Sequence, residues 1–302
     1  MKDILVDLQS IIKRGFIKEN ESMKGHTTLK IGGDAAYFVS VFDRDELLEL
    51  MKYINQNSVP YFLLGNGSNI LVSDNGFDGV VITLDGEFKE MSVSGTRITA
   101  GAGAFLSQIS RTALEHSLTG VEFASGIPGT LGGALVMNAG AYGGEMKQIV
   151  KTVCVLEKDK TGYEIKSYTV DDMKFAYRYS IAKERELIFL SAEMALTKGE
   201  ASKIKETMEE LNRQRREKQP LEYPSAGSTF KRPEGYFAGK LISDAGLKGY
   251  SVGGAQVSEK HAGFCINKGN ATAADFERLM QDVIKKVKEE TGVVLEPEIE
   301  KV

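Results

Sequence analysis

Cysteine and histidine are scarce in this sequence, and neither is spaced as a metal site requires. The 302 residues include two cysteines and three histidines. Cys154 and Cys265 each lie in a short apolar run, where a free cysteine behaves as a small hydrophobic residue. His26, His116 and His261 are scattered along the chain, and none of them forms a metal-ligand spacing with either cysteine. We therefore expect two buried, unreactive thiols and no bound metal.

The sequence also lacks the marks of a secreted or membrane protein. No apolar run reaches the roughly 20 residues that a membrane-spanning helix needs. Asp3 and Asp7 stand where a signal peptide would need an apolar core. The net charge is -4, so no broad positive surface is expected for nucleic acid or anionic lipid. We expect a cytoplasmic protein that binds neither nucleic acid nor membrane.

The common nucleotide-binding motifs are missing too. Gly65-x-Gly67 has Ile70 in the place of the third glycine of a dinucleotide fingerprint, and the Gly-x-Gly of residues 101–103 also lacks that third glycine. No Gly-Lys-Ser or Gly-Lys-Thr of a P-loop occurs. A Rossmann domain and a P-loop are therefore disfavoured.

Glycine, by contrast, is abundant and clustered, with 32 in the chain. Two blocks, residues 65–69 and 126–141, can bring backbone N–H groups against phosphate oxygens because no side chain intervenes. Neutral donors such as Ser68 and Thr130 suit a pyrophosphate. Either block alone is also consistent with simple tight turns. The candidate cofactor-binding residues are Gly65, Asn66, Gly67, Ser68, Asn69, Gly126, Ile127, Pro128, Gly129, Thr130, Gly132, Gly133, Asn138, Gly140 and Ala141.

The spacing of apolar residues predicts a mixture of helices and strands. Asp43 with Glu46, and Thr272 with Asp275, have the spacing of helix-capping pairs. The pattern becomes β-like after the second glycine block, and a long charged helix ends before Pro220. The predicted strands cover residues 35–41, 59–64, 79–84, 97–100, 153–157, 163–168, 187–196 and 293–302, and the predicted helices follow residue 43 or cover about 105–114, 202–218, 236–245 and 272–291.

Six segments in order along the chain resemble the motifs of one enzyme family, the UDP-N-acetylenolpyruvoylglucosamine reductases. The two glycine blocks resemble its FAD-binding segments, and residues 26–33 resemble its opening signature. The resemblance runs from about Thr27 to the end of the chain and is to the shorter branch of the family. Its three catalytic motifs are matched by Tyr177-Arg178-Tyr179-Ser180, by residues 226–233 and by Leu295-Glu296-Pro297-Glu298-Ile299.

This resemblance implies an α+β fold: a two-lobed FAD-binding region of the vanillyl-alcohol-oxidase/PCMH type, followed by a smaller α+β substrate-binding domain. We expect the FAD domain at residues 1–200, a linking helix at 201–219 and the substrate domain at 220–302. The implied reaction reduces the enolpyruvyl ether of UDP-N-acetylenolpyruvoylglucosamine to UDP-N-acetylmuramate, a step of peptidoglycan synthesis. NADPH supplies the hydride through FAD. No covalent attachment residue lies in the glycine blocks, so we expect non-covalent FAD, in a monomer.

The resemblance also implies the catalytic residues. Arg178 would stabilise the developing carboxylate enolate, Ser228 would donate the proton, and Glu298, if protonated, would donate a hydrogen bond to the enolate. Read alone, each of the three is a surface or turn residue. Lys231 and Arg232 are candidates for the substrate phosphates, although the longer branch tends to carry Asn at the second position. Weaker substrate-binding candidates are Gln256 and His261, with Lys260.

Two other functions share part of these features. An oxidase of the same FAD fold would have the glycine blocks without the Gly-Ser-Thr-Phe-Lys and terminal Glu motifs. A flavin- or nucleotide-sugar-binding module without catalysis would need neither hydride step. NADPH oxidation measured with and without the enolpyruvyl substrate separates these alternatives.

Overall fold

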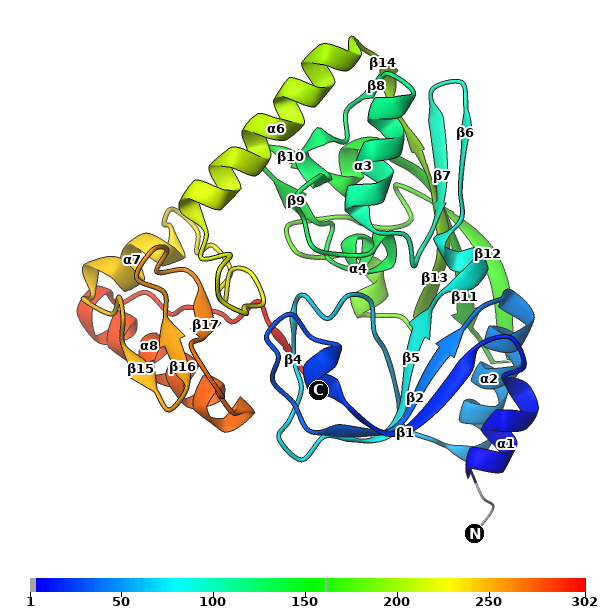
Figure 1. The fold of residues 1–302 in the computed structure, drawn as a ribbon, viewed down its shortest axis with the longest axis horizontal. Helices are drawn as coiled ribbons and strands as arrows, with labels where there is room; N and C mark the ends of the chain where they lie inside the picture. Colours follow the sequence, from blue (N-terminus) through cyan, green and yellow to red (C-terminus); the bar gives the residue numbers. More distant parts are fainter. Residues whose placement is uncertain (1–3, 161) are drawn as a thin grey trace. The chain divides into compact units, whose positions relative to one another are not determined.

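The computed structural model describes residues 4–160 and 162–302, so Asp3 lies outside the described residues. The chain divides into two compact units. Both contain helices and sheets, which confirms the predicted α+β class (Figure 1). Unit 1 comprises Met1–Glu19, Tyr37–Gly65 and Gly79–Gln214, and unit 2 comprises Asn20–Ala36, Asn66–Asp78 and Arg215–Val302.

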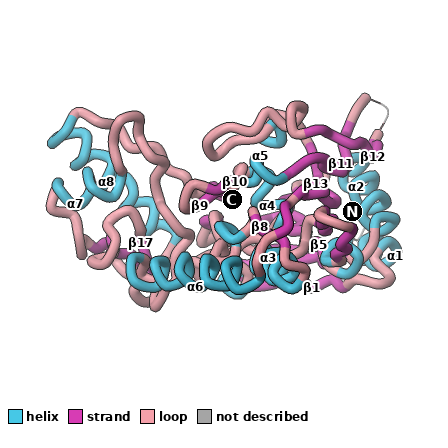
Figure 2. Tube along the Cα trace, turned by 90° about the horizontal axis from the view of Figure 1, so that it is seen from above, coloured by secondary structure: helices cyan, strands magenta, loops and turns pink. Residues whose placement is uncertain are grey.

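Unit 1 contains a five-stranded antiparallel sheet in the order β12-β11-β13-β7-β6. Its strands β11, β12 and β13 lie side by side in Figure 2. Its strand β13 is buried on both faces at its start, because Ile188 and Phe189 point into two different hydrophobic clusters. Further along, buried Ala192 and Met194 alternate with more exposed residues. The strands are β6 Met91–Ser94, β7 Arg97–Gly101, β11 Val150–Lys158, β12 Tyr163–Thr169 and β13 Leu187–Ala195.

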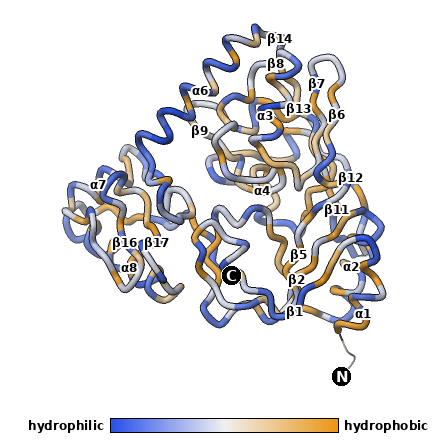
Figure 3. Tube along the Cα trace, in the orientation of Figure 1, coloured by the Kyte–Doolittle hydropathy of each residue, from blue (hydrophilic) through white to orange (hydrophobic). Residues whose placement is uncertain are grey.

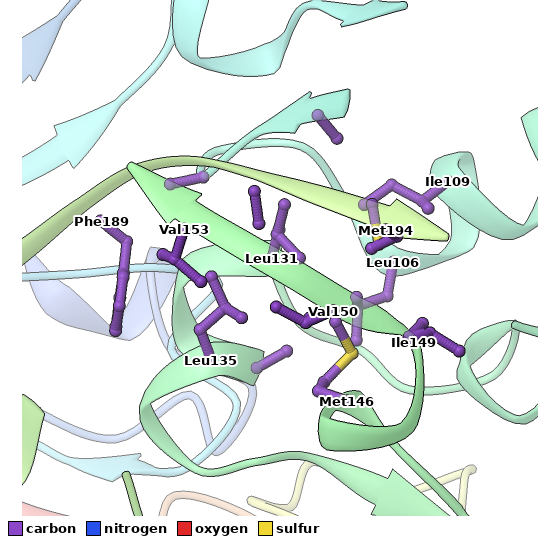
Figure 4. Packing of buried hydrophobic residues seen from close by; sticks show 14 of the residues in the cluster. Leu106, Ile109, Leu131, Leu135, Met146, Ile149, Val150, Val153, Phe189 and Met194 are labelled. Carbon is purple, nitrogen blue, oxygen red and sulfur yellow. The ribbon is translucent and has the colours of Figure 1, made fainter. Parts of the chain in front are cut away.

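Three helices of unit 1 contribute to the larger of these clusters: α3 Leu106–Glu115, α4 Leu131–Val136 and α5 Met146–Ile149. Their apolar side chains pack with those of β11 and β13 around one interior (Figure 4). This packing fixes both ends of the glycine-rich segment that connects α3 to α5. The side chains labelled in Figure 4 are Leu106, Ile109, Leu131, Leu135, Met146, Ile149, Val150, Val153, Phe189 and Met194.

The second sheet has four strands in the order β1-β2-β5-β3, and β3 runs parallel to β5. Helix α2 begins as predicted, because the Asp43 side chain accepts a hydrogen bond of 2.9 Å from the amide of Glu46. The sequence pattern missed α1 and β1. These elements are α1 Ile4–Ile11, β1 Phe16–Ser22, β2 Asp34–Val41, α2 Arg44–Asn57, β3 Tyr61–Leu63 and β5 Phe77–Leu84, and the short pairs in unit 1 are β8 Leu118–Thr119 with β14 Thr197–Lys198 and β9 Gly140–Ala141 with β10 Gly144–Glu145.

The predicted charged helix is α6, Ala201–Lys218. Ile204 is its one buried residue among those described, and Figure 3 shows the rest of its trace as largely hydrophilic. Its last turn carries Arg215, Arg216 and Lys218, which favourably oppose the partial negative charge at a helix C-terminus. A polar helix of this kind owes its stability to local charge pairs more than to burial.

Unit 2 contains a three-stranded antiparallel sheet, β15-β16-β17, which the sequence pattern did not predict. Helix α8 is capped as predicted. The Thr272 side chain accepts from the amide of Asp275, and Gly292 ends the helix in the left-handed conformation with φ 74°. The elements of this unit are β4 Ile70–Leu71, α7 Ala238–Asp244, β15 Ser251–Val252, β16 Ala255–Val257, β17 Cys265–Asn267, α8 Ala273–Thr291 and β18 Glu300–Lys301.

The predicted terminal strand of residues 293–302 is wrong as one element. Only Glu300–Lys301 forms a strand, β18, which runs parallel to β4. The segment changes partner half-way: Glu298 bonds the carbonyl of Thr229, whereas Glu300 bonds that of Asn69. Pro297 has no amide to donate, so the ladder cannot continue unbroken through it.

The expectation of two buried thiols holds for one of them. Cys265 is 1% exposed, and burial raises the pKa of its thiol to about 12. Cys154 is only half-buried. Its strand β11 lies between two neighbours, yet its side chain packs at the margin of a hydrophobic cluster.

Candidate functional site

The first glycine block leaves four backbone donors available. Among the residues that the structure describes, the amides of Gly65, Gly67, Ser68 and Asn69 donate no hydrogen bond to the chain. Gly67 has φ 60°, and a Cβ on it would lie 2.1 Å from the carbonyl oxygen of His26. The loop therefore needs glycine for its path. Backbone N–H groups that are free in this way can bind an anion.

The second block is fixed at one end to the core of unit 1. The amides of Leu131 and Gly132 donate to the carbonyls of Ala104 and Ala102, both over 2.8 Å. Thr130 caps α4, with its side chain accepting from the amide of Gly133 over 3.4 Å. Before this anchor, the amide of Gly126 has no acceptor among the described residues.

The two blocks meet within unit 1 at Gly65 and Thr130. A Cβ on Gly65 would lie 2.7 Å from the Thr130 hydroxyl oxygen. A side chain at that position would therefore displace Thr130. Glycine-lined backbone with unsatisfied amides and a neutral hydroxyl matches what a dinucleotide pyrophosphate requires, so the residues present fit FAD.

Asn138, predicted as a cofactor donor, has its side chain committed to the protein. It is 2% exposed. The amide nitrogen of its side chain donates to the Glu145 carboxylate over 3.0 Å and to the carbonyl of Ala176 over 3.2 Å. Its side-chain oxygen accepts from the amide of Lys147 over 2.8 Å. Gly140 and Ala141 follow in β9, half-buried.

Arg178 lies at the tip of a tight turn in unit 1. Ala176 and Tyr179 exchange two backbone hydrogen bonds of 3.1 and 3.2 Å across this turn. Arg178 has φ 55°, a left-handed conformation that an arginine adopts only where its surroundings impose it. Its guanidinium lies 5.1 Å from the ring centroid of Tyr177. The conformation sets the direction in which the side chain leaves the backbone.

Ser228 and Glu298 lie on neighbouring backbone segments of unit 2. Glu298 donates its amide to the carbonyl of Thr229 over 2.9 Å, and Lys231 donates to the carbonyl of Glu296 over 2.8 Å. Within the described part of the chain, the Ser228 hydroxyl has no hydrogen-bond partner. This hydroxyl is therefore held one residue before Thr229, where the two segments pair.

Lys231 and Arg232, which are predicted to bind the substrate phosphates, make different contacts within the protein. The Lys231 ammonium pairs with the Glu296 carboxylate. The Arg232 guanidinium lies 3.9 Å from the ring centroid of Phe237, and its Nε donates to the carbonyl of Tyr236 over 3.2 Å. Arg232 is exposed, so an anion in solvent can reach its guanidinium. Lys231 would have to exchange its carboxylate partner for a phosphate.

Gln256 and His261, the weaker substrate-binding candidates, both make side-chain contacts within the protein. The Gln256 side-chain nitrogen donates to Ser251 over 3.0 Å, while its oxygen is buried without a partner among the described residues. Burial lowers the pKa of His261, whose ring packs against Phe264 at 4.9 Å. His261 is therefore neutral near neutral pH and contributes no positive charge. Lys260 donates to the carbonyl of Arg216 over 2.7 Å.

Three polar contacts in unit 2 escaped the sequence pattern. The Thr28 hydroxyl donates to the carbonyl of Ser225 over 2.7 Å, and the Thr28 amide donates to that of Gly67. The side-chain nitrogen of Asn69 donates to the carbonyl of Glu298 over 3.0 Å. Thr28 thus touches both the first glycine block and the segment before Ser228. The partners are far apart in sequence, so no local pattern indicates them.

In residues 4–160 and 162–302, no group of three or more His, Cys, Asp or Glu side chains is placed to hold a metal. Within the same residues, no helix combines the length and apolar character needed to cross a bilayer.

Two family models match the chain. The model of the FAD binding domain matches residues 35–160, and that of the UDP-N-acetylenolpyruvoylglucosamine reductase C-terminal domain matches residues 219–302. The chain is 57% identical to the UDP-N-acetylenolpyruvoylglucosamine reductase of Caldanaerobacter subterraneus subsp. tengcongensis, over 99% of this chain and 98% of the relative. The chain belongs to the UDP-N-acetylenolpyruvoylglucosamine reductase family.

Other members of the reductase family agree with this. The enzyme of Streptococcus pneumoniae strain JJA is 50% identical over 94% of this chain and 93% of its own. The crystal structure of the Thermus caldophilus reductase has a TM-score of 0.80 and 35% identity, covering 95% of this chain and 98% of that one. The fold is therefore that of the UDP-N-acetylenolpyruvoylglucosamine reductases, an FAD-binding α+β domain followed by the family's C-terminal domain.

Proposed function

We propose that this chain reduces the enolpyruvyl ether of UDP-N-acetylenolpyruvoylglucosamine with NADPH, giving UDP-N-acetylmuramate for peptidoglycan synthesis. Whole-length similarity to the reductase family supports the reaction. The structural observation that carries it is the pairing of the segment that follows Ser228 with the segment that holds Glu298. The backbone segments that carry two of the three proposed catalytic residues are therefore hydrogen-bonded to each other.

FAD is held, in this proposal, by backbone amides of the two glycine blocks. The free amides of Gly65, Gly67, Ser68 and Asn69 suit the pyrophosphate, together with the amide of Gly126. The side chain of Asn138 contributes no donor to FAD, since it is committed to the protein. Bound there, FAD would supply the hydride-transfer chemistry that links NADPH to the vinyl carbon of the substrate.

Arg178 stabilises the charge that develops on the substrate carboxylate. A guanidinium matches a carboxylate in a two-point contact. Its contribution arises in the transition state, where charge spreads into the carboxylate, and each well-aimed donor of this kind is worth about 3–4 kcal/mol. The left-handed turn that carries Arg178 fixes the direction of this donor before substrate arrives.

Ser228 gives a proton to the carbon beside the carboxylate. Its hydroxyl is half-buried and without a protein partner in the described residues, so it is free to point at substrate. Glu298 in its protonated form donates a hydrogen bond to the enolate oxygen. Arg232 and Lys231, with Gln256, bind the substrate diphosphate. His261, whose Nδ1 accepts from the amide of Gly263 over 3.1 Å, serves by packing or through its Nε2–H donor.

We further propose that residues 1–200 form the FAD domain, 201–219 the linking helix and 220–302 the substrate domain. The C-terminal family model, which begins at residue 219, supports the last boundary. The reactants, NADPH and a UDP-linked sugar, are cytoplasmic metabolites, so we place the protein in the cytoplasm. We expect it to act as a monomer.

Steady-state NADPH oxidation by the FAD-loaded protein tests the proposal. We expect oxidation under anaerobic conditions only when the enolpyruvyl substrate is present, with a lactyl ether as product. Oxygen-dependent turnover of an alcohol or amine would show an oxidase instead. Substrate binding without NADPH oxidation would show a binding module.

A further inference from the structure

Asn138 lies between the second glycine block and the turn that carries Arg178. It is buried and adopts φ 42°, a left-handed conformation that asparagine tolerates better than most residues. It follows the end of α4 directly. All of its side-chain partners lie in unit 1, as Asn138 itself does.

Both N–H donors and the carbonyl oxygen of the Asn138 side chain make hydrogen bonds within the protein. Its two N–H groups face Glu145 at 3.0 Å and the carbonyl of Ala176 at 3.2 Å. Its oxygen accepts from the amide of Lys147 at 2.8 Å. A side-chain amide offers two donors and one carbonyl oxygen, so each group is engaged. The role of this side chain is therefore internal.

The Ala176 carbonyl is the first anchor of the Arg178 turn. It accepts both from Tyr179 across the turn, over 3.2 Å, and from Asn138. A second anchor lies just past the turn, where the buried Ser180 hydroxyl donates to the carbonyl of Val136 over 2.9 Å. The turn is thus tied to the end of α4 on both sides of Arg178.

We propose that Asn138 is a positioning residue for Arg178. Its side chain fixes the Ala176 carbonyl, and with it the left-handed turn that aims the guanidinium at the substrate carboxylate. The proposal rests on the role of Arg178 in the proposed function. A catalytic contact displaced by about 1 Å can lose on the order of 100-fold in rate, so the effect is large enough to measure.

Asn138→Asp replaces both donors with an oxygen at nearly constant shape. The new carboxylate would face the Glu145 carboxylate and the Ala176 carbonyl. In the double variant Asn138→Asp, Glu145→Gln, the side-chain nitrogen at position 145 can donate to the carboxylate at position 138. This restores the first contact with its direction reversed. The Ala176 carbonyl still lacks its donor in this double variant. Glu145→Gln alone keeps an acceptor for Asn138 and is the matched control.

We expect the double variant to regain the thermal stability and FAD affinity of the wild type. Its flavin reduction by NADPH should be normal, whereas reoxidation by the enolpyruvyl substrate should be slower by about 10- to 100-fold. Binding of the substrate to the oxidised holoenzyme, followed by the change in flavin absorbance, should weaken as well. Glu145→Gln should match the wild type in all four measurements.

An Arg178→Ala background completes the test. There, the pair of changes at 138 and 145 should slow reoxidation by less than about 2-fold, because the side chain they position is gone. An undiminished effect in that background overturns the positioning role. Normal reoxidation in the double variant overturns it while leaving the role of Arg178 intact. Normal reoxidation in Arg178→Ala itself overturns the role of Arg178 and, with it, this inference.

Discussion

The side-chain nitrogen of Asn69 donates a hydrogen bond of 3.0 Å to the backbone carbonyl of Glu298. This contact joins the first glycine block to the C-terminal segment within unit 2. Two residues after Glu298, a second bond continues the connection, since the amide of Glu300 donates to the carbonyl of Asn69 over 3.0 Å. A change in the glycine block therefore reaches the backbone that carries a proposed catalytic carboxyl group.

Asn69→Asp should slow substrate reduction by about 10-fold, because a buried acceptor that loses its donor costs about 1–3 kcal/mol. Flavin reoxidation by the enolpyruvyl substrate measures it. Ser68→Ala is the neighbouring control: it removes a hydroxyl from the same block without touching Glu298, so any loss should fall on FAD affinity. An Asn69→Asp variant impaired in FAD affinity alone would contradict the prediction.

FAD should be bound without a covalent bond. Neither cysteine nor any histidine lies in residues 65–69 or 126–141, and the fit described above relies on backbone amides. Acid precipitation of the holoprotein should release all of the flavin into the supernatant. Yellow colour that stays in the washed pellet would show a covalent link.

Arg178→Ala should lower turnover while leaving flavin reduction by NADPH largely intact. The carboxylate charge that Arg178 stabilises develops only when hydride reaches the substrate, so one half-reaction should carry the loss. Stopped-flow measurement separates the two halves. Arg178→Lys should retain charge without the two-point geometry and lie in between. An equal loss in both halves would assign Arg178 to NADPH binding or to structure.

A buried ion cluster in unit 1 predicts a pH dependence of stability. Glu157 is 3% exposed and accepts from Tyr168 over 3.0 Å. Burial alone would raise the pKa of Glu157, but hydrogen bonds from Lys166 and Tyr168, with the charge of Arg185, hold that pKa below its ordinary value. The folded state thus binds the proton less readily than the unfolded chain. The resulting stabilisation exists above the unfolded pKa and is lost as pH falls through the folded one.

Glu157→Gln should therefore reduce the free energy of unfolding by about 1–3 kcal/mol near neutral pH. The gap between wild type and variant should narrow as pH falls below about 4.5. Urea unfolding over that range measures both. Glu164→Gln, at an exposed carboxylate that also contacts Lys166, should change stability by less than about 1 kcal/mol. A gap that stays constant with pH would assign the effect of Glu157 to packing.

Local patterns in the sequence predicted the elements whose causes are local. Asp43 with Glu46, and Thr272 with Asp275, lie three residues apart, so their capping roles are visible in the sequence. The Asn138–Ala176 contact spans 38 residues and the Asn69–Glu298 contact spans 229. Such pairs depend on the tertiary path of the chain. The prediction of one continuous terminal strand failed for the same reason, because the hydrogen-bond partner of this segment changes from Thr229 to Asn69.

The catalytic residues were accessible only through the family motifs. Arg178 sits in a turn whose left-handed conformation carries no glycine or asparagine signal at that position. Asn138 was recognisable as part of a glycine-rich motif, and its sequence context suggested a ligand donor. The structure shows its side chain bonded inward instead. Chemistry can be assigned from motifs, but which group each donor serves depends on packing.

Ser228→Ala should fold, bind FAD and accept hydride from NADPH, yet turn over far more slowly. A positioned proton donor contributes about 10²–10⁴-fold, so a loss of that order or larger is expected. The Ser228 hydroxyl has no partner elsewhere in the described residues, so its removal breaks no internal hydrogen bond there. Stopped-flow reoxidation of the reduced flavin by substrate measures the step directly.

The matched variant is Ser228→Cys, which keeps a proton donor of similar size and should recover part of the lost rate. Turnover of the wild type in heavy water should place deuterium on the carbon next to the carboxylate, because that carbon receives the solvent-exchangeable proton. Label from NADPH deuterated at its transferable hydrogen should reach the methyl group only where it has not exchanged on the flavin first. Near-normal turnover of Ser228→Ala would reject Ser228 as the acid. Glu298, whose amide bonds the carbonyl of Thr229 beside it, would then be the next candidate.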